Sequence, residues 1–294
     1  MSQVELGLTP VKGVSDRAEQ THRPLIVVGP ARGWTALNLR ELWEYRDLVR
    51  ILAGRDVKLR YRQTALGVIW VILQPLVAAI IFAVIFGHLA RLTSDGSPYL
   101  LFVFCGLMPW NLFASVLQRG GMSLVGDTRL VQKVYFPRML IPVSSAGACL
   151  IDFAVSFVVL LVFMAAYRVT PGWQILTVPG FLCLTIAGSL GIALWLAAFN
   201  VRYRDFMYAL PFIIQVWMFA TPVAYAGKII PRSWQWLYSL NPAFGYVEGF
   251  RWALLGRDSL NATTLSLTVA ISLLALMSGA FIFRRVERDF ADVV

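Results

Sequence analysis

Residues 60–75, RYRQTALGVIWVILQP, separate a polar, basic part of the chain from a series of long apolar runs. Lys58, Arg60 and Arg62 end the polar part, and an almost unbroken apolar run follows from Leu66. A basic cluster directly before an apolar run marks a cytoplasmic membrane boundary, because Lys and Arg are retained on the cytoplasmic side. This stretch therefore places the residues before it in the cytoplasm and sets the direction in which every later span crosses.

The composition is that of a polytopic membrane protein. Hydrophobic residues make up 58% of the chain and charged residues 14%, whereas soluble domains have about half and about a quarter. Several apolar runs exceed the roughly 18 residues that a helix needs to cross a bilayer. The net charge of +10 does not indicate nucleic-acid binding, because the basic residues lie where membrane topology would place them.

The apolar runs predict an all-α protein with six transmembrane helices. The predicted spans cover about residues 64–87, 99–118, 139–167, 175–199, 207–225 and 264–283. With these spans, 20 of the 26 Lys and Arg residues lie on the inner side and six on the outer side. This asymmetry favours a topology with both chain ends in the cytoplasm.

The segments that flank the spans are expected to lie on the cytoplasmic side. Residues 1–37 have no helical or strand period and predict a mobile extension. Residues 38–63 predict an amphipathic helix at the membrane interface, with Asn38 as its cap and Glu41 three residues later. A helix of a small soluble domain is the alternative for this segment. Residues 284–294 form a cytoplasmic tail.

The long outer segment 226–262 is not a plain loop. It contains two short apolar and aromatic pieces, Trp234–Leu240 and Ala243–Leu255, divided by Asn241-Pro242. Each piece is too short to cross a bilayer. The pattern therefore predicts two re-entrant half-helices that enter the outer leaflet between spans five and six.

The sequence lacks the motifs of an enzyme or an ATPase. No G-x-x-x-x-G-K-[ST] stretch is present, so no ATP-binding P-loop is expected in this chain. Cys105, Cys149 and Cys183 lie inside apolar runs and have no metal-ligand spacing with His22 or His88. We therefore expect no catalytic residue, cofactor or metal here, and energy would come from a partner protein.

Asp152 lies near the middle of the third predicted span. A carboxylate at this depth is costly unless it faces protein or water. It could line a translocation path or a subunit interface, or it could be a hydrogen-bonded structural group. Gln74, Asn111, Gln118 and Gln215 are candidate partners.

Aromatic residues are plentiful, with ten Trp, ten Tyr and nineteen Phe. Trp110, Trp234 and Trp236 are among those at predicted membrane interfaces, where an aromatic belt is expected. Some of these rings could instead line a path for sugars, because aromatic rings stack on the apolar faces of pyranoses.

From about residue 42 to residue 256 the chain resembles the permease subunit of type-2 ABC exporters, in the branch that exports polysaccharides such as O-antigen, capsule and teichoic acid. Six blocks carry the resemblance in the order of that family: DVKLRYRQTALGVIWVILQP at 56–75, GLMPW at 106–110, LVQKVYFPRMLIP at 130–142, NVRYRD at 200–205, Thr221-Pro222, and NPAFGYVEGFRWALL at 241–255.

The resemblance implies a homodimer in the bacterial inner membrane that pairs with two ATPase subunits, which would hold ATP and Mg. The substrate would be a lipid-linked glycan. A coupling element toward the ATPase would lie in the inner loop, in a short helix with apolar anchors and a charged rim; an ordinary interfacial loop is the alternative. Its candidate residues are Asp127, Arg129, Leu130, Lys133, Tyr135 and Phe136. Candidates for the translocation path or exit are Gln74, Trp110, Asn111, Asp152, Gln215, Trp234, Trp236, Glu248 and Arg251.

Three other functions stay open from the sequence. A secondary transporter or channel would need no ATPase, but it would be expected to hold more intramembrane ionisable residues than Asp152. A membrane-bound glycan enzyme would need acidic residues in an outer loop, where Asp95 is a weak candidate. Within the exporter family, export of a small drug or lipid is the alternative to export of a glycan.

Overall fold

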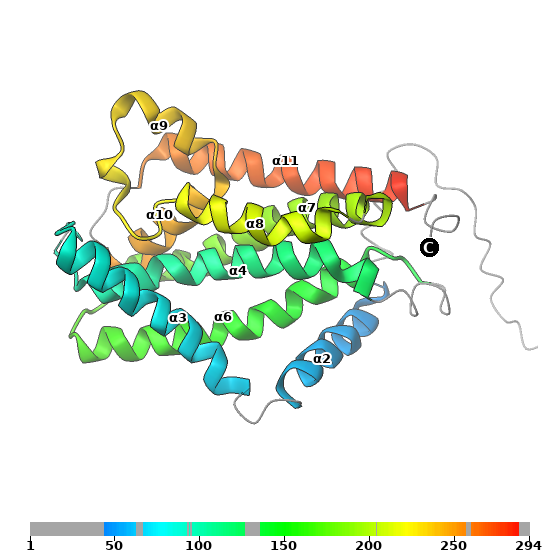
Figure 1. The fold of residues 1–294 in the computed structure, drawn as a ribbon, viewed down its shortest axis with the longest axis horizontal. Helices are drawn as coiled ribbons and strands as arrows, with labels where there is room; N and C mark the ends of the chain where they lie inside the picture. The colour runs from blue at the N-terminus through cyan, green and yellow to red at the C-terminus, as the bar shows by residue number, and fades with distance from the viewer. Residues whose placement is uncertain are drawn as a thin grey trace, which may run out of the picture.

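The computed structural model describes residues 44–62, 67–92, 94, 96–126, 136–203, 205–256 and 260–287. Every regular element in these ranges is a helix, which confirms the predicted all-α class (Figure 1). The predicted extension 1–37, the cap at Asn38 and residues 288–294 of the predicted tail lie outside the described residues.

The helices follow one another along the chain with short connections. Their bounds are α2 Arg46–Arg62, α3 Gly67–Phe82, the π-helix η2 Ala83–Leu89, α4 Tyr99–Gly126, α6 Leu140–Ala166, the 3₁₀ helix η3 Trp173–Thr177, α7 Val178–Arg202, α8 Phe206–Phe219, the 3₁₀ helix η4 Gly227–Ile229, α9 Arg232–Ser239, α10 Pro242–Leu255 and α11 Ala262–Val286.

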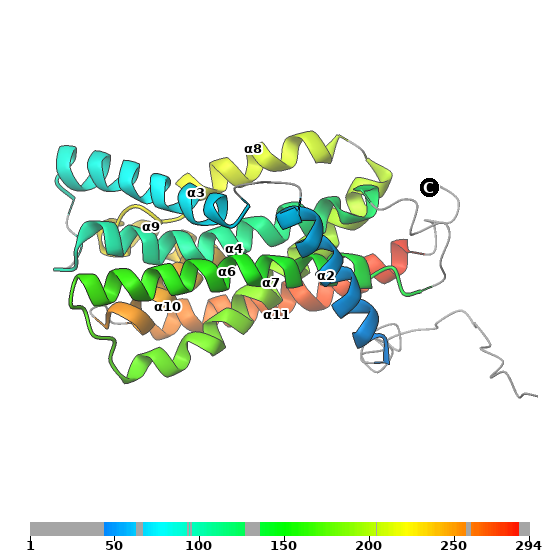
Figure 2. The same cartoon turned by 90° about the horizontal axis from the view of Figure 1, so that it is seen from below.

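The long helices α4, α6, α7 and α11 run along the long axis of the molecule, and α8 runs beside them (Figures 1 and 2). One end of this bundle carries η2, α9 and the first turns of α4 and α11; we call it the α9 end. The opposite end carries the last turns of α4, α7 and α11 and the start of α6. Different polar contacts stabilise the two ends.

Helix α4 is the centre of the fold. All residues from Leu101 to Trp110 are buried, because α3, α6, α7 and α10 pack around this helix. A helix that is apolar on all sides is stable only in such a position. The helix also continues through Pro109, although a proline inside a helix commonly kinks or breaks it. Proline removes a single N–H group, and the surrounding helices hold the backbone on both sides of it.

Helices α7 and α11 approach each other through glycine. A Cβ atom added at Gly279 of α11 would collide with the carbonyl of Gly191 on α7, and one added at Gly191 would collide with the backbone at Ala275. Small residues allow this close backbone contact, which is common between helices in membranes. The two helices therefore form a tightly packed pair that supports α4 from one side (Figure 1).

Five helical segments of the described chain are long and apolar enough to cross a membrane, where the sequence predicts six. They are Ile69–Leu89, Tyr99–Gly126, Leu140–Ala166, Trp173–Arg202 and Ala262–Val286. The fifth predicted span, 207–225, contains α8, whose 14 residues extend about 21 Å. The helix ends before Pro222, because a proline disfavours the helical conformation of the residue before it.

The two short apolar pieces that the sequence shows between spans five and six form two short helices, α9 and α10. Helix α9 lies at the edge of the bundle and exposes Trp234 and Trp236. Helix α10 is instead buried along most of its length, against α4, α7 and α11. The two helices have different environments although both are apolar and adjacent in the chain.

Helix α2 crosses the bundle obliquely and contacts α6 (Figure 2). Leu52 is buried, whereas Ile51 and Leu59 are exposed, and a Cβ atom at Gly147 of α6 would lie 3.0 Å from Cβ of Ala53. One face of α2 is therefore attached to the bundle, and its remaining surface includes apolar groups that a membrane interface would cover.

Candidate functional site

A buried arginine organises the α9 end of the protein. Arg251 of α10 is 1% exposed. Its Nη1 donates to the carbonyl oxygens of Pro222 at 2.8 Å and of Tyr225 at 3.2 Å, and its Nη2 donates to the carbonyl of Val223. The carboxylate of Glu248 lies 3.3 Å from Nη1. These carbonyls follow the end of α8 and face no helical N–H of their own, so the guanidinium supplies the donors that they need.

The guanidinium also occupies a space that α4 provides. Its Cζ lies 3.7 Å from the ring centroid of Phe102, a distance at which a cation is attracted by the ring face. A Cβ atom at Gly106 would lie 2.7 Å from Nη2 of Arg251, which is too close. Glycine at this position therefore leaves the room in which the arginine sits.

Asn241 joins the same region to the start of α10. Its Oδ1 accepts from the N–H of Ala243 at 3.1 Å and caps the helix, and it also accepts from Nε1 of Trp217 at 2.9 Å. Its Nδ2 donates to Oγ1 of Thr221 at 2.8 Å. A single amide thus fixes the end of α8 and the beginning of α10 relative to each other.

Tyr99 adds a contact from the start of α4. Its hydroxyl donates to the carbonyl of Ala224 at 2.5 Å. A Cβ atom at Gly87 in η2 would lie 2.8 Å from the Tyr99 ring, so the end of the first apolar helix packs directly on it. We call the set of Arg251, Asn241, Tyr99 and the carbonyls of residues 222–225 the Arg251 clamp.

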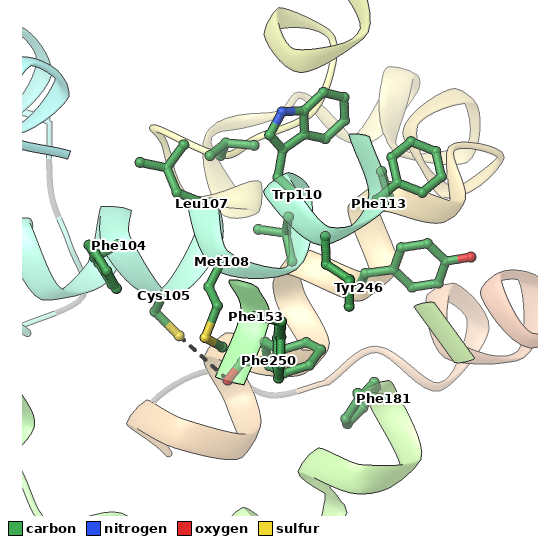
Figure 3. Packing of buried hydrophobic residues seen from close by; sticks show 14 of the residues in the cluster. Phe104, Cys105, Leu107, Met108, Trp110, Phe113, Phe153, Phe181, Tyr246 and Phe250 are labelled. Carbon is green, nitrogen blue, oxygen red and sulfur yellow. Dashed lines mark hydrogen bonds between the residues drawn. The ribbon is translucent and has the colours of Figure 1, made fainter. Parts of the chain in front are cut away.

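Aromatic side chains from several helices pack together in the core of the subunit (Figure 3). Phe113 of α4 packs edge-on against Trp217 at 5.1 Å between ring centroids, and Phe250 of α10 packs edge-on against Phe153 of α6 at 5.7 Å. Trp110 is 2% exposed and lies 5.6 Å from Phe113. Trp110, a candidate for the path, therefore belongs to the interior of the subunit, as does Arg251.

A second polar cluster connects three helices within the apolar bundle. Asp152 of α6 forms an ion pair with Nη1 of Arg60 on α2, and its Oδ2 lies 3.7 Å from Nη2 of Arg119 on α4. The three side chains are 30%, 16% and 34% exposed for Arg60, Asp152 and Arg119. We call them the arginine–aspartate triad. It attaches the oblique helix α2 to the bundle.

The triad corrects the partners that the sequence suggests for Asp152. The candidate amides were Gln74, Asn111, Gln118 and Gln215, but the described contacts are with two arginines. The carboxylate and the two guanidinium groups compensate one another's charge, which lowers the cost of placing them in an apolar environment. Arg60 and Arg119 were the sequence signal for this contact. The signal was missed because membrane topology already explained why basic residues lie at these positions.

The other candidates for the path lie on exposed surfaces or partly buried ones. Gln74 of α3 and Gln215 of α8 are exposed, and Asn111 is half-buried. Trp234 and Trp236 of α9 are 57% and 65% exposed. The structure thus does not bring all the candidates together within one subunit.

Of the coupling residues, the structure describes Phe136, which is buried at the end of the bundle opposite α9. Asp127, Arg129, Leu130, Lys133 and Tyr135 lie outside the described residues. Within the described part of the chain, no three His, Cys, Asp or Glu residues come close enough to hold a metal ion.

Comparison with known proteins places this chain among membrane transporters. The family described as ABC-2 type transporter matches residues 47–255. An O-antigen export system permease protein of Myxococcus xanthus is 30% identical over 259 residues, which cover 87% of this chain and 98% of that protein. An O-antigen export system permease protein of Klebsiella pneumoniae is 26% identical, and the matched residues cover 84% of this chain and 95% of that protein. A polysialic acid transport protein of Escherichia coli is 25% identical, and the matched residues cover 81% of this chain and 93% of that protein.

Proposed function

Because this chain belongs to the ABC-2 type transporter family, we propose that it is the permease subunit of an ATP-driven exporter that moves a lipid-linked polysaccharide across the bacterial cytoplasmic membrane. The observation that carries the proposal is the end-to-end similarity to permeases named for O-antigen export, which leaves no large part of those relatives unmatched. Three sequence blocks that contribute to the Arg251 clamp, at 106–110, 221–222 and 241–255, also belong to the family resemblance.

The subunit crosses the membrane six times in this proposal. The fifth crossing along the chain is made by α8 together with the non-helical residues 220–226, in which Arg251 binds the carbonyls of Pro222 and Tyr225. Non-helical backbone at membrane depth is tolerated only where protein or water satisfies it. Helices α9 and α10 then form the outer re-entrant unit, with the α9 end outside and the opposite end in the cytoplasm.

Reporter fusions test this topology. A reporter that is active only outside the cytoplasm is expected to be active after Gly172 and Gly256 and silent after Gly126, Tyr203 and Val294, because 20 of 26 basic residues lie on the proposed inner side. The pair Tyr203 and Gly256 isolates the crossing that contains α8. Silent fusions at both Tyr203 and Gly256, with Gly172 active, would contradict a crossing between Tyr203 and Gly256.

The exporter acts as a homodimer in this proposal, with the path between two copies. Helices α3 and α8 lie along the same side of the bundle (Figure 2) and expose large apolar groups, including Trp70 and Phe212. Gln74 and Gln215 are exposed on these same helices. An amide facing lipid would lack hydrogen-bond partners, whereas a path between subunits would give it protein, water or glycan.

ATP binding to two partner ATPase subunits supplies the driving force. Closure of the ATPase dimer pushes on the inner loop around 127–137 and on α2, and the triad passes the movement of α2 to α4 and α6. The two copies then rock apart and the lipid head and its glycan pass between them. Neutral amides and aromatic rings hold a glycan weakly enough for it to slide.

Transport in inverted membrane vesicles tests the proposed activity. Vesicles that contain this chain and its cognate ATPase are expected to take up the lipid-linked glycan only when hydrolysable ATP is present, because this chain has no P-loop. Vesicles that contain this chain alone are the control. Glycan uptake by this chain alone, driven by an ion gradient, would instead identify a secondary transporter.

A further inference from the structure

The segment between α4 and α6 leaves and rejoins the bundle at one apolar cluster. Leu124 in the last turns of α4 is 3% exposed, and Phe136 just before α6 is 7% exposed. Both belong to a cluster that includes Phe283 of α11 and Leu194 of α7. The end of α4 and the residue just before α6 are therefore held at the same apolar cluster.

A single carboxylate fastens the second end of this segment. Oε1 of Glu287, just after α11, accepts from the backbone N–H of Arg138 at 2.7 Å. Nη1 of Arg138 donates in turn to the carbonyl of Glu287 at 3.4 Å. Met139, the N-cap of α6, offers no side-chain acceptor. A carboxylate from a helix 149 residues away thus stands at the positive end of α6, where negative charge is favourable.

A buried amide fastens the first end. Asn200 of α7 is 1% exposed and its Nδ2 donates to the carbonyl of Gly121 on α4 at 2.7 Å. A Cβ atom at Gly120 would lie 2.9 Å from Cβ of Ala193, so α4 and α7 are in close contact at this level. The amide therefore joins two helices that are already packed, one turn before α4 ends.

Both fasteners come from the same pair of helices. Asn200 lies on α7 and Glu287 follows α11, and these two helices are joined at Gly191 and Gly279. From this arrangement we infer that Glu287 and Asn200 are positioning residues that fix the end of α4 and the start of α6, which flank segment 127–135, to the α7–α11 pair, so that a push on the segment moves the bundle. The inference rests on the proposed coupling role of this segment.

A segment that transmits force must not turn freely where it joins the bundle. Without Glu287, the N-terminus of α6 loses a charge-assisted acceptor from α11, and movement of 127–135 would be absorbed by rotation at Pro137 and Arg138. ATP hydrolysis by the partner would then continue while export falls. A residue with a merely structural role would lower the amount of protein without separating hydrolysis from export.

The test uses Lys133→Cys in full-length protein that lacks Cys105, Cys149 and Cys183, assembled with the cognate ATPase. Crosslinking to the ATPase, its change on adding ATP, ATP hydrolysis and glycan export are measured for each variant at equal protein level. Glu287→Ala is expected to lower glycan export per ATP hydrolysed about tenfold and to flatten the ATP-dependent change in crosslinking. Glu287→Gln keeps an acceptor oxygen and should retain most of both. Gly180→Ala on α7 is the control and should be unchanged, because no atom lies within 4 Å of the added Cβ.

The outcomes separate the inference from the function on which it rests. If the parent protein crosslinks to the ATPase in an ATP-dependent way and Glu287→Ala behaves like the parent, the positioning role is wrong while the coupling role stands. If the parent itself gives no crosslink to the ATPase, the coupling role fails and the inference falls with it. Should Glu287→Ala not insert, Asn200→Ala removes the other fastener and must show the same loss of export per ATP; normal coupling in that variant overturns the inference.

Discussion

Replacing Arg251 with alanine is expected to abolish export and to lower the stability of the folded subunit by about 3 to 5 kcal/mol. The reason is that the carbonyls of Pro222, Val223 and Tyr225 would lose their donor in a buried region, and Glu248 would lose a cation. Each buried acceptor left without a donor costs about 1 to 3 kcal/mol. Thermal unfolding in detergent and the yield of monodisperse protein measure the effect.

A milder variant tests the same site without removing the charge. Gly106→Ala should destabilise the protein because its Cβ would lie 2.7 Å from Nη2 of Arg251. Helix propensity alone predicts the opposite sign, a gain of about 1 kcal/mol for alanine over glycine. Gly180→Ala on α7 is the matched control, since no atom lies within 4 Å of the added Cβ. Normal stability and export in Arg251→Ala would show that the Arg251 clamp is not needed.

Separating α2 from the bundle is the second large effect that we expect. Asp152→Ala leaves Arg60 and Arg119 beside each other without their carboxylate. Breaking a fully buried ion pair costs about 3 to 5 kcal/mol, and the partial exposure of these three side chains lowers the expected cost to about 1 to 3 kcal/mol. Export should fall further than the loss of folded protein alone would cause, because α2 could then move without moving α4 and α6.

A double-mutant cycle measures the contact itself. The coupling energy between Arg60→Ala and Asp152→Ala should be about 1 to 2 kcal/mol, from unfolding in detergent. The exposed pair Asp47 and Arg50 on the same helix is the control, with side chains 71% and 75% exposed, and its coupling energy should be about 0.5 kcal/mol or less. Equal coupling energies in the two cycles would contradict a special role for the triad.

The helices of this protein could be predicted from the sequence because each is specified locally. A membrane helix satisfies its own backbone hydrogen bonds, so the length and polarity of a segment largely decide whether it forms. The long runs and the two short pieces around Asn241-Pro242 are therefore visible in the sequence. The prediction was less accurate at 207–225, because local hydropathy does not register that Pro222 ends α8 and that the following carbonyls bond elsewhere.

The partners of the polar residues were decided by tertiary structure alone. The sequence by itself determined that Asp152 is a costly group within a span and that Arg251 lies in a short apolar helix. It could not determine that Asp152 meets Arg60, 92 residues earlier, or that Arg251 fills a space left by Gly106. Such contacts depend on how α2, α4, α6 and α10 pack. Hydrophobic burial is non-directional, so the pattern of apolar residues along the chain does not show which helices pack together.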